Sequence, residues 1–251
     1  MDPASRLVVP AILDALQVAR KRARRANCLS QLHQFALAIE MFRNNNEGGS
    51  PRGKEDFPYD RGGFPHWLSE LYPVYLATPE VYRCPNDPTR GEEGGVPAWF
   101  SDPQYNASQY AETDDTANCA ASAEIKALRN TDIEACSYIY EFNSAACSWW
   151  QDTRTDANGK LWADFNGNGF VSWREAKRTE QEGLTFDDAT KKIVVDENKI
   201  YDGRVPIIRC FWHTRQGRDL NSEMVLNLAC ENKNIFESTA FGEDWKHAEE
   251  L

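Results

Sequence analysis

The sequence predicts an α+β fold in which one long N-terminal helix packs on an antiparallel β-sheet. Apolar residues recur every three or four positions from residue 4 to residue 46, which is the period of an α-helix. Short segments rich in β-branched and aromatic residues dominate the second half of the chain, and turn-forming residues separate them. The chain has 251 residues, of which 41% are hydrophobic, so it is long enough to bury a substantial core.

The predicted N-terminal helix has about 40 residues and is roughly 60 Å long at 1.5 Å per residue. Its first half is polar nearly all round between Arg20 and Arg25, so we expect this half to protrude. Its second half carries an apolar stripe that should pack on the body: Leu29, Leu32, Phe35, Ala36, Ile39 and Phe42. We therefore divide the chain into a long helix over residues 1–48 and a globular head over residues 49–251.

The head begins with a loop rich in proline, glycine and charged residues. An amphipathic pattern over residues 64–76 predicts a short helix, and residues 86–118 are typical of a long polar loop. Strands are predicted over residues 137–142, 191–196, 205–212, 224–229 and 234–238, with a hairpin turn at residues 231–234. A long helix followed by an antiparallel meander is an α+β arrangement.

Residues 164–175 match the twelve-residue loop of an EF-hand calcium site in order and spacing. Gly169 stands at loop position 6, where the sharp turn needs a residue that adopts positive φ without cost. The predicted Ca2+ ligands are Asp164, Asn166, Asn168, the backbone carbonyl of Phe170, Ser172 (directly or through water) and the bidentate Glu175. The alternative is an Asn-Gly turn without an ion. The glutamate in register and the apolar Val171 at position 8 favour the ion site.

This loop predicts a single structural calcium site and not a paired calcium sensor. It has only two carboxylates, and because low ligand charge weakens binding we expect a dissociation constant on the order of 0.1–1 mM. A helix leaves the loop over residues 172–182 and ends at Gly183, whereas a short strand over residues 159–163 enters it. We place the loop in an insertion over about residues 152–184.

The charge distribution argues against nucleic acid as a partner. Residues 1–25 carry six basic and two acidic side chains, a balance of +4, so the rest of a chain of net charge −11 carries −15. An acidic body repels phosphates and attracts divalent cations. The basic cluster near the N-terminus lies on a helix without aromatic residues, which is typical of a solvated helix face.

No catalytic residues are predicted, and we do not expect an enzyme. Paired carboxylates can hydrolyse glycosides, but adjacent residues in a loop rarely reach the separation that a substrate requires. The histidines are scattered and offer no triad. The acidic pairs are Asp114–Asp115, Asp187–Asp188 and Glu249–Glu250, and the four histidines are His33, His66, His213 and His247.

The seven cysteines favour an oxidising compartment with two or three disulfides. Cys28 and Cys84 are the pair that we expect to be bonded, because the segment before Cys84 must fold back on the long helix. No Cys-x-x-Cys pair is present, so a zinc ribbon is not expected. Cys210-Phe-Trp-His213 has spacing compatible with a metal, but the sequence shows no second half for such a site. The partners of Cys119, Cys136, Cys147, Cys210 and Cys230 do not follow from sequence.

Several segments carry a family resemblance. The stretch from Leu7 to Phe42 has a proline, an Ala/Arg-rich segment, a cysteine and a Leu-x-Gln segment in the order found in pilins, and Trp67-Leu68 and Tyr82-Arg-Cys84-Pro85 match later landmarks. The strand segments at 205–210 and 225–228 agree as well. The chain thus resembles the bacterial type II secretion pseudopilins and type IV prepilins over about its first 90 and last 50 residues.

The resemblance implies a pilin-like fold and a structural subunit of a secretion or pilus-like filament. Its implied partners are other pseudopilin subunits, through the N-terminal helix, and the inner membrane, through an apolar N-terminal segment. That segment and the processing site are missing from this sequence, which has no run of 18 apolar residues and no signal peptide. We therefore expect a truncated, monomeric chain whose full-length form lies in the periplasm or at the cell surface. Major pseudopilins also use calcium to hold a C-terminal loop.

An alternative function is a calcium-dependent binding module at the cell surface, an adhesin or a carbohydrate-binding protein. Tryptophan side chains can stack on sugars, although burial in the core is the more favoured interpretation. The tryptophans concerned are Trp99, Trp149, Trp150, Trp162 and Trp212.

Overall fold

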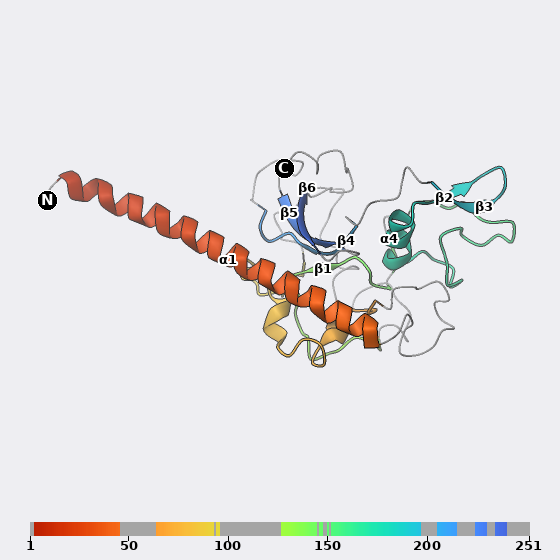
Figure 1. Cartoon of the computed structure of the whole chain (residues 1–251), viewed down its shortest axis with the longest axis horizontal. Coiled ribbons are helices and arrows are strands. Elements are labelled where there is room, and N and C mark those ends of the chain that lie inside the picture. Colours follow the sequence, from red (N-terminus) through yellow and green to blue (C-terminus); the bar gives the residue numbers. More distant parts are fainter. Residues whose placement is uncertain are drawn as a thin grey trace.

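The computed structural model describes residues 3–45, 64–92, 94–95, 127–144, 146–147, 150, 152–196, 205–214, 224–229 and 234–239. One long helix lies along a body of strands and short helical turns (Figure 1). The predicted α+β fold, with a long N-terminal helix and antiparallel strands, is confirmed. No helix within the described ranges is long and apolar enough to cross a lipid bilayer.

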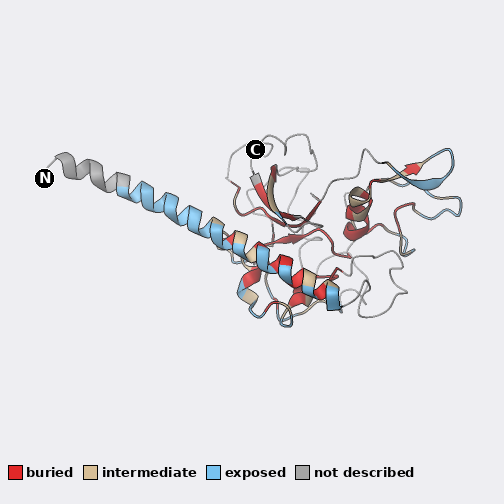
Figure 2. Cartoon of the chain, in the orientation of Figure 1, coloured by how far each residue is buried: buried red, intermediate tan, exposed pale blue. Residues whose placement is uncertain are grey.

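Helix α1 (Pro3–Asn45) has 43 residues and is therefore about 65 Å long. It has two unlike halves (Figure 2). Residues 12–24 are exposed all round, whereas one face is buried from Cys28 onward. The spacing of this buried face is that of one side of a helix. It consists of Cys28, Leu32, Phe35, Ala36, Ala38, Ile39 and Phe42.

The main sheet has four antiparallel strands in the spatial order β1-β4-β5-β6. Its strands are β1 (Ile139–Tyr140), β4 (Pro206–Cys210), β5 (Met224–Ala229) and β6 (Ile235–Thr239). Strand β4 is buried along its whole length, and α1 packs against β5 and β6 (Figure 1). A separate unit combines helix α4 (Trp173–Gln181) with an antiparallel hairpin of β2 (Leu184–Asp187) and β3 (Lys192–Val195).

The described residues form two hydrophobic clusters. In the larger one, the ring of Phe35 on α1 meets Tyr82 and Tyr138 edge-on, with ring centroids 5.2 and 5.3 Å away. Further side chains come from α1, β1, β4 and β5, from two 3-10 turns, η1 (Leu68–Leu71) and η2 (Pro79–Tyr82), and from the segments that connect these elements. The smaller cluster lies between α4, β2 and the segment before α4, and it consists of Trp162, Ala163, Val171, Ala176 and Phe186.

Two predicted elements of the main body differ from the structure. Residues 64–76 contain only the single turn η1 and not an amphipathic helix. Pro65 and Pro73 bracket this segment, and proline both lacks the N–H of a helix interior and disfavours the helical conformation of the preceding residue. The predicted strand over 137–142 is reduced to the two residues of β1. The hairpin turn at 231–234, apart from Asn234, and the loop from 96 to 118 lie outside the described residues.

A buried polar network joins α4 to the main sheet. Glu141 lies 3.2 Å from Nη1 of Arg209 on β4 and 3.3 Å from Nζ of Lys177 on α4. Arg209 also donates to Oδ1 of Asn227 on β5 at 3.0 Å, and Asn227 donates to Oγ of Ser238 on β6 at 2.8 Å. Buried charges that are paired and hydrogen-bonded in this way fix the relative position of the elements that carry them.

Replacing Glu141 by alanine should destabilise the protein by about 3–5 kcal/mol, because Lys177 and Arg209 are then buried without their shared carboxylate. Urea unfolding monitored by circular dichroism measures this loss. Glu182→Ala is the matched control, because the Glu182 side chain is 40% exposed where that of Glu141 is 2% exposed. Equal losses in the two variants would contradict a structural role for the network.

Deleting residues 1–19 should leave the melting temperature nearly unchanged, because the described side chains of this segment, residues 12–19, are exposed. Light scattering at micromolar concentration should give the mass of one chain both for the full chain and for the shortened chain. Differential scanning calorimetry with light scattering tests both points. A compact dimer that unfolds on deletion would show that the projecting half of α1 is part of the folded core.

Candidate metal sites

The loop over residues 164–175 is a succession of tight turns held by side-chain oxygens. Oδ1 of Asn166 accepts the N–H of Asn168 at 2.9 Å, and Oδ1 of Asn168 accepts the N–H of Phe170 at 3.1 Å. Gly169 has φ of +93°, a conformation that a residue with a Cβ rarely adopts. The predicted role of this glycine is therefore confirmed.

Asp164 organises the first half of the loop. Its Oδ1 accepts the N–H groups of Gly167 and Asn168 at 2.6 and 3.1 Å, and its Oδ2 accepts that of Gly169 at 2.9 Å. The loop backbone therefore wraps around one carboxylate.

Glu175 closes the loop from helix α4. Its Oε2 accepts the N–H and the hydroxyl of Ser172, both at 2.8 Å, and its Oε1 accepts the N–H of Asn166 at 3.1 Å. Ser172 is the N-cap of α4 and accepts in turn from the N–H of Glu175. The predicted helix after the loop is thus present as α4, and Gly183, with φ of +62°, follows it. The segment before the loop forms a single bridge between Thr155 and Leu161 and not the predicted strand.

The electrostatics of this loop favour a cation. Asp164 and Glu175 are each 2% exposed, and neither forms an ion pair with a basic residue in the described part of the chain. Burial and the charge of Asp164 raise the pKa of Glu175. Buried carboxylates are normally paired or bound to a metal. An all-oxygen set with two carboxylates suits Ca2+, so the predicted ligands Asp164, Asn166, Asn168, Phe170, Ser172 and Glu175 fit this ion.

The loop is connected to the main body through α4. Arg174 donates through Nε to the carbonyl of Phe142 at 2.9 Å and through Nη2 to the carbonyls of Phe64, at 2.9 Å, and Pro65. Lys177 reaches Glu141, as described above. An ion in the loop would therefore hold the start of α4, and α4 in turn contacts both hydrophobic clusters.

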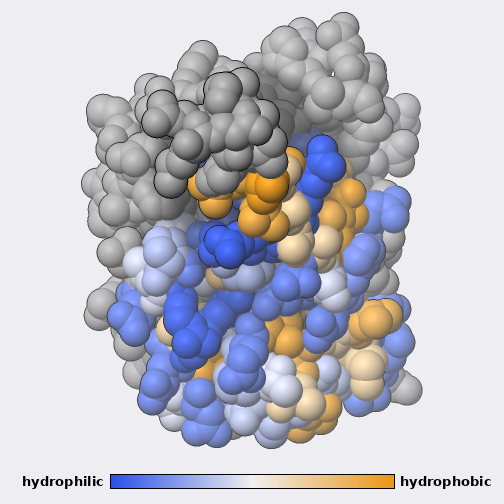
Figure 3. All heavy atoms as spheres, turned by 90° about the vertical axis from the view of Figure 1, so that its left-hand side faces the viewer, coloured by the Kyte–Doolittle hydropathy of each residue, from blue (hydrophilic) through white to orange (hydrophobic). Residues whose placement is uncertain are grey.

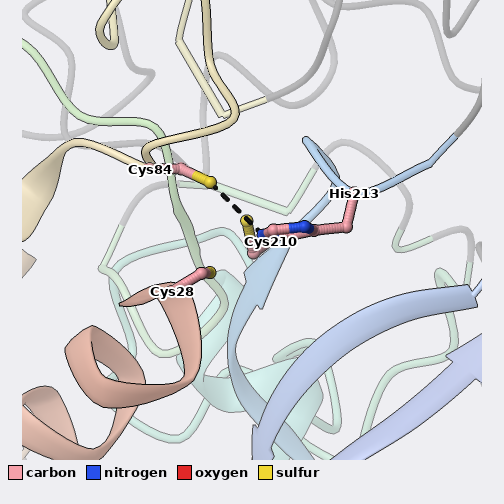
Figure 4. A group of neighbouring side chains, drawn as sticks. All are labelled: Cys28, Cys84, Cys210 and His213. Carbon is pink, nitrogen blue, oxygen red and sulfur yellow. Dashed lines mark hydrogen bonds between the residues drawn. The ribbon is translucent and has the colours of Figure 1, made fainter. Parts of the chain in front are cut away.

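A second group of ligands lies where α1 meets the sheet, and the sequence analysis did not predict it. Cys28 comes from α1, Cys84 follows η2, Cys210 ends β4 and His213 lies in the turn after β4 (Figure 4). The three sulfur atoms and one imidazole nitrogen all lie within 4.8 Å of one another. We call these four residues the Cys/His cluster. The Cys210-x-x-His213 spacing was the only local sign of this cluster in the sequence. The other two ligands, Cys28 and Cys84, come from distant positions in the chain.

The cysteine prediction is partly wrong. The structure brings Cys28 and Cys84 together, but neither forms a disulfide, and the sulfur of Cys210 lies within 4.8 Å of both. Hydrogen bonds with the thiols of Cys210 and Cys84 lower the pKa of Cys28 to about 4, whereas burial raises the pKa of Cys210 well above its usual value. Cys119 and Cys230 lie outside the described residues.

The tryptophans proposed to stack on sugars are buried or half-buried where the structure describes them. Trp162 and Trp212 are buried and Trp150 is half-buried, so no described tryptophan is exposed, while Trp99 and Trp149 lie outside the described residues. Trp150 and Trp162 line a cleft of about 230 Å³ beside Arg154.

The acidic pair that is described belongs to the β2–β3 turn. A hydrogen bond from Thr190 lowers the pKa of Asp187, and Asp188 forms exposed ion pairs with Arg154 and Lys191. The pairs at 114–115 and 249–250 and His247 lie outside the described residues. His33 is exposed on α1, and His66 is buried with Nδ1 2.7 Å from Oγ of Ser144.

Comparison with protein-family models, with curated protein sequences and with solved structures found no match to this chain.

Added calcium should stabilise the protein by about 1.4 kcal/mol at ten times the dissociation constant, because the ion binds the folded loop alone. For a chain of this size the melting temperature should rise by about 3–6 °C relative to calcium-free buffer. Glu175→Gln should abolish most of this rise, and Glu182→Gln at the C-cap of the same helix should retain it. Identical melting curves with and without calcium would show that the loop is an ion-free turn.

Proposed function

We propose that this chain is a structural subunit of a pilin-like filament of the bacterial type II secretion or type IV pilus class, with one Ca2+ in the 164–175 loop. The division of α1 into a buried half and a projecting half carries this proposal. A helix that packs on an antiparallel sheet along half of its length and then continues into solvent leaves a surface that other subunits can cover.

The projecting half of α1 supports contact with further copies of the helix. Ile12, Leu13 and Leu16 share one side of it by their spacing, and each is about half exposed. Figure 3, viewed from the end from which α1 projects, shows hydrophobic patches between hydrophilic ones. Contiguous exposed apolar side chains on a folded protein commonly mark an interaction site. Packing of α1 against α1 of neighbouring subunits would remove this surface from water.

Charge complementarity supports the same assembly. The projecting half carries the exposed Arg20, Lys21, Arg22 and Arg24, whereas the chain beyond residue 25 carries a net charge of −15. The basic helix of one subunit would therefore be attracted to the acidic body of the next. Arg25 already forms an ion pair of this kind within the chain, with Glu237 on β6.

Calcium would serve this role as a structural ion. Bound to Asp164 and Glu175, it would fix the start of α4, which Arg174 and Lys177 connect to the main body. The head would then be held as one unit in the periplasm or at the cell surface. In the class that the chain resembles, the inner membrane is the partner before assembly.

Site-specific photo-crosslinking in cells that express the full secretion or pilus system tests the filament. A benzophenone amino acid at position 16, which is exposed on α1, should give a ladder of adducts at multiples of the chain mass. The control is the same probe at position 195, which is equally exposed but lies on β3. Leu13→Asp should suppress the ladder without lowering the melting temperature, because Leu13 contacts solvent in the free chain.

A ladder of equal strength from position 195 would show that the chains associate without specific contacts through α1, and it would contradict the filament proposal. The absence of any ladder from position 16 would do the same.

A further inference from the structure

We propose that Cys28, Cys84, Cys210 and His213 bind one zinc ion in tetrahedral coordination. Structural zinc takes four protein ligands, and three cysteines with one histidine is an established set for it. The proposed site is separate from the 164–175 loop and uses none of its residues.

The spacing of the ligand atoms agrees with this coordination. With Zn–S bonds of about 2.3 Å and a Zn–N bond of about 2.0–2.1 Å, a tetrahedron places sulfur and nitrogen about 3.6 Å apart and two sulfurs about 3.8 Å apart. The distance from Cys84 Sγ to His213 Nε2 is 3.5 Å. All other ligand atoms lie within 4.8 Å of one another, so side-chain shifts of about 1 Å bring all four onto an ion.

A disulfide explains the cluster less well. A disulfide joins two sulfurs at about 2.05 Å and uses two cysteines. It would leave a third thiol and an imidazole nitrogen at the same point without a role. Cys28 and Cys210 are completely buried and Cys84 is nearly so, while His213 is half-buried and gives the cluster its accessible side. A site with four converging donors and one accessible ligand is what a metal requires.

Contacts around the cluster hold the ligands in place. The N–H of Asn86 donates to Cys84 Sγ at 3.4 Å, and Asn86 Nδ2 donates to the carbonyl of Trp212 at 2.7 Å. Asn86 therefore connects the turn that carries Cys84 to the segment that carries Cys210 and His213. Thr214 closes that segment into a turn by donating to the carbonyl of Phe211. Such outer contacts orient metal ligands.

The chemistry of the donors selects zinc over calcium. Thiolates are soft ligands that suit Zn2+, whereas Ca2+ requires oxygen. Binding deprotonates the thiols and releases up to three protons, and three thiolates with Zn2+ carry a net charge of −1. The ion would join α1, the turn after η2 and the end of β4, segments more than 50 residues apart in sequence. It would thus cross-link the helix to the body at the point where the helix leaves it.

Cobalt is the probe for this site. The full chain, reduced and freed of metal, should take up one Co2+ per molecule with a thiolate-to-cobalt charge-transfer band and the visible bands of tetrahedral cobalt. One equivalent of zinc should abolish this spectrum, and excess calcium should not. Cys136→Ser is the matched control, because Cys136 is a buried cysteine that forms no disulfide and lies outside the cluster, and this variant should bind cobalt like the parent chain.

His213→Ala tests the ligand set with little risk to folding, because His213 is half-buried and its replacement removes only one ligand. It should keep the circular dichroism spectrum of the parent and lose at least about tenfold in cobalt affinity, since even outer-shell changes cost about 10–100-fold. Glu175→Gln should bind cobalt unchanged. The proposal is overturned if the reduced chain binds no cobalt, if His213→Ala binds it equally well, or if peptide mapping of the native protein finds a disulfide between two of the three cysteines.

Discussion

The burial of one face of α1 between Cys28 and Phe42 is the contact on which the rest of this structure depends. The main sheet is small, and one of its strands has only two residues. A small sheet needs a covering layer to bury its apolar side chains. Helix α1 and the turns η1 and η2 provide that layer, with Phe35 between Tyr82 and Tyr138 near its centre. Without the helix, the strands have too little apolar surface to fold around.

The α4 unit is held by polar contacts more than by apolar ones. Its hydrophobic cluster has five buried members, whereas Arg174 and Lys177 reach deep into the main body through charge-assisted hydrogen bonds and ion pairs. Such contacts are strong only when the backbone that presents them is fixed. The turns of the 164–175 loop set the start of α4 and therefore the position of both basic side chains. Local loop geometry and the distant network are thus parts of one arrangement.

What the sequence predicted follows the range of the interactions involved. The 164–175 loop could be predicted residue by residue because its ligands, its glycine and its N-cap all lie within twelve consecutive positions. Helix α1 and strands β3 to β6 were predictable because their apolar periods are local. The Cys/His cluster was missed because its members are brought together only by the packing of α1 and the turn after η2 against the main sheet. The segment 64–76 was mispredicted because an amphipathic pattern outweighed the restriction imposed by Pro65 and Pro73.

The two halves of α1 also have a mechanical consequence. The projecting segment of α1, from residue 3 to residue 27, is about 38 Å long, and the packed segment, from residue 28 to residue 45, is about 27 Å long. The helix is therefore a lever whose outer arm is the longer one. A sideways force on its outer end produces a torque that the packed arm must balance through Phe35, Ile39 and Phe42. A force on the projecting segment of α1 therefore acts as a shear force on the aromatic side chains of the larger hydrophobic cluster.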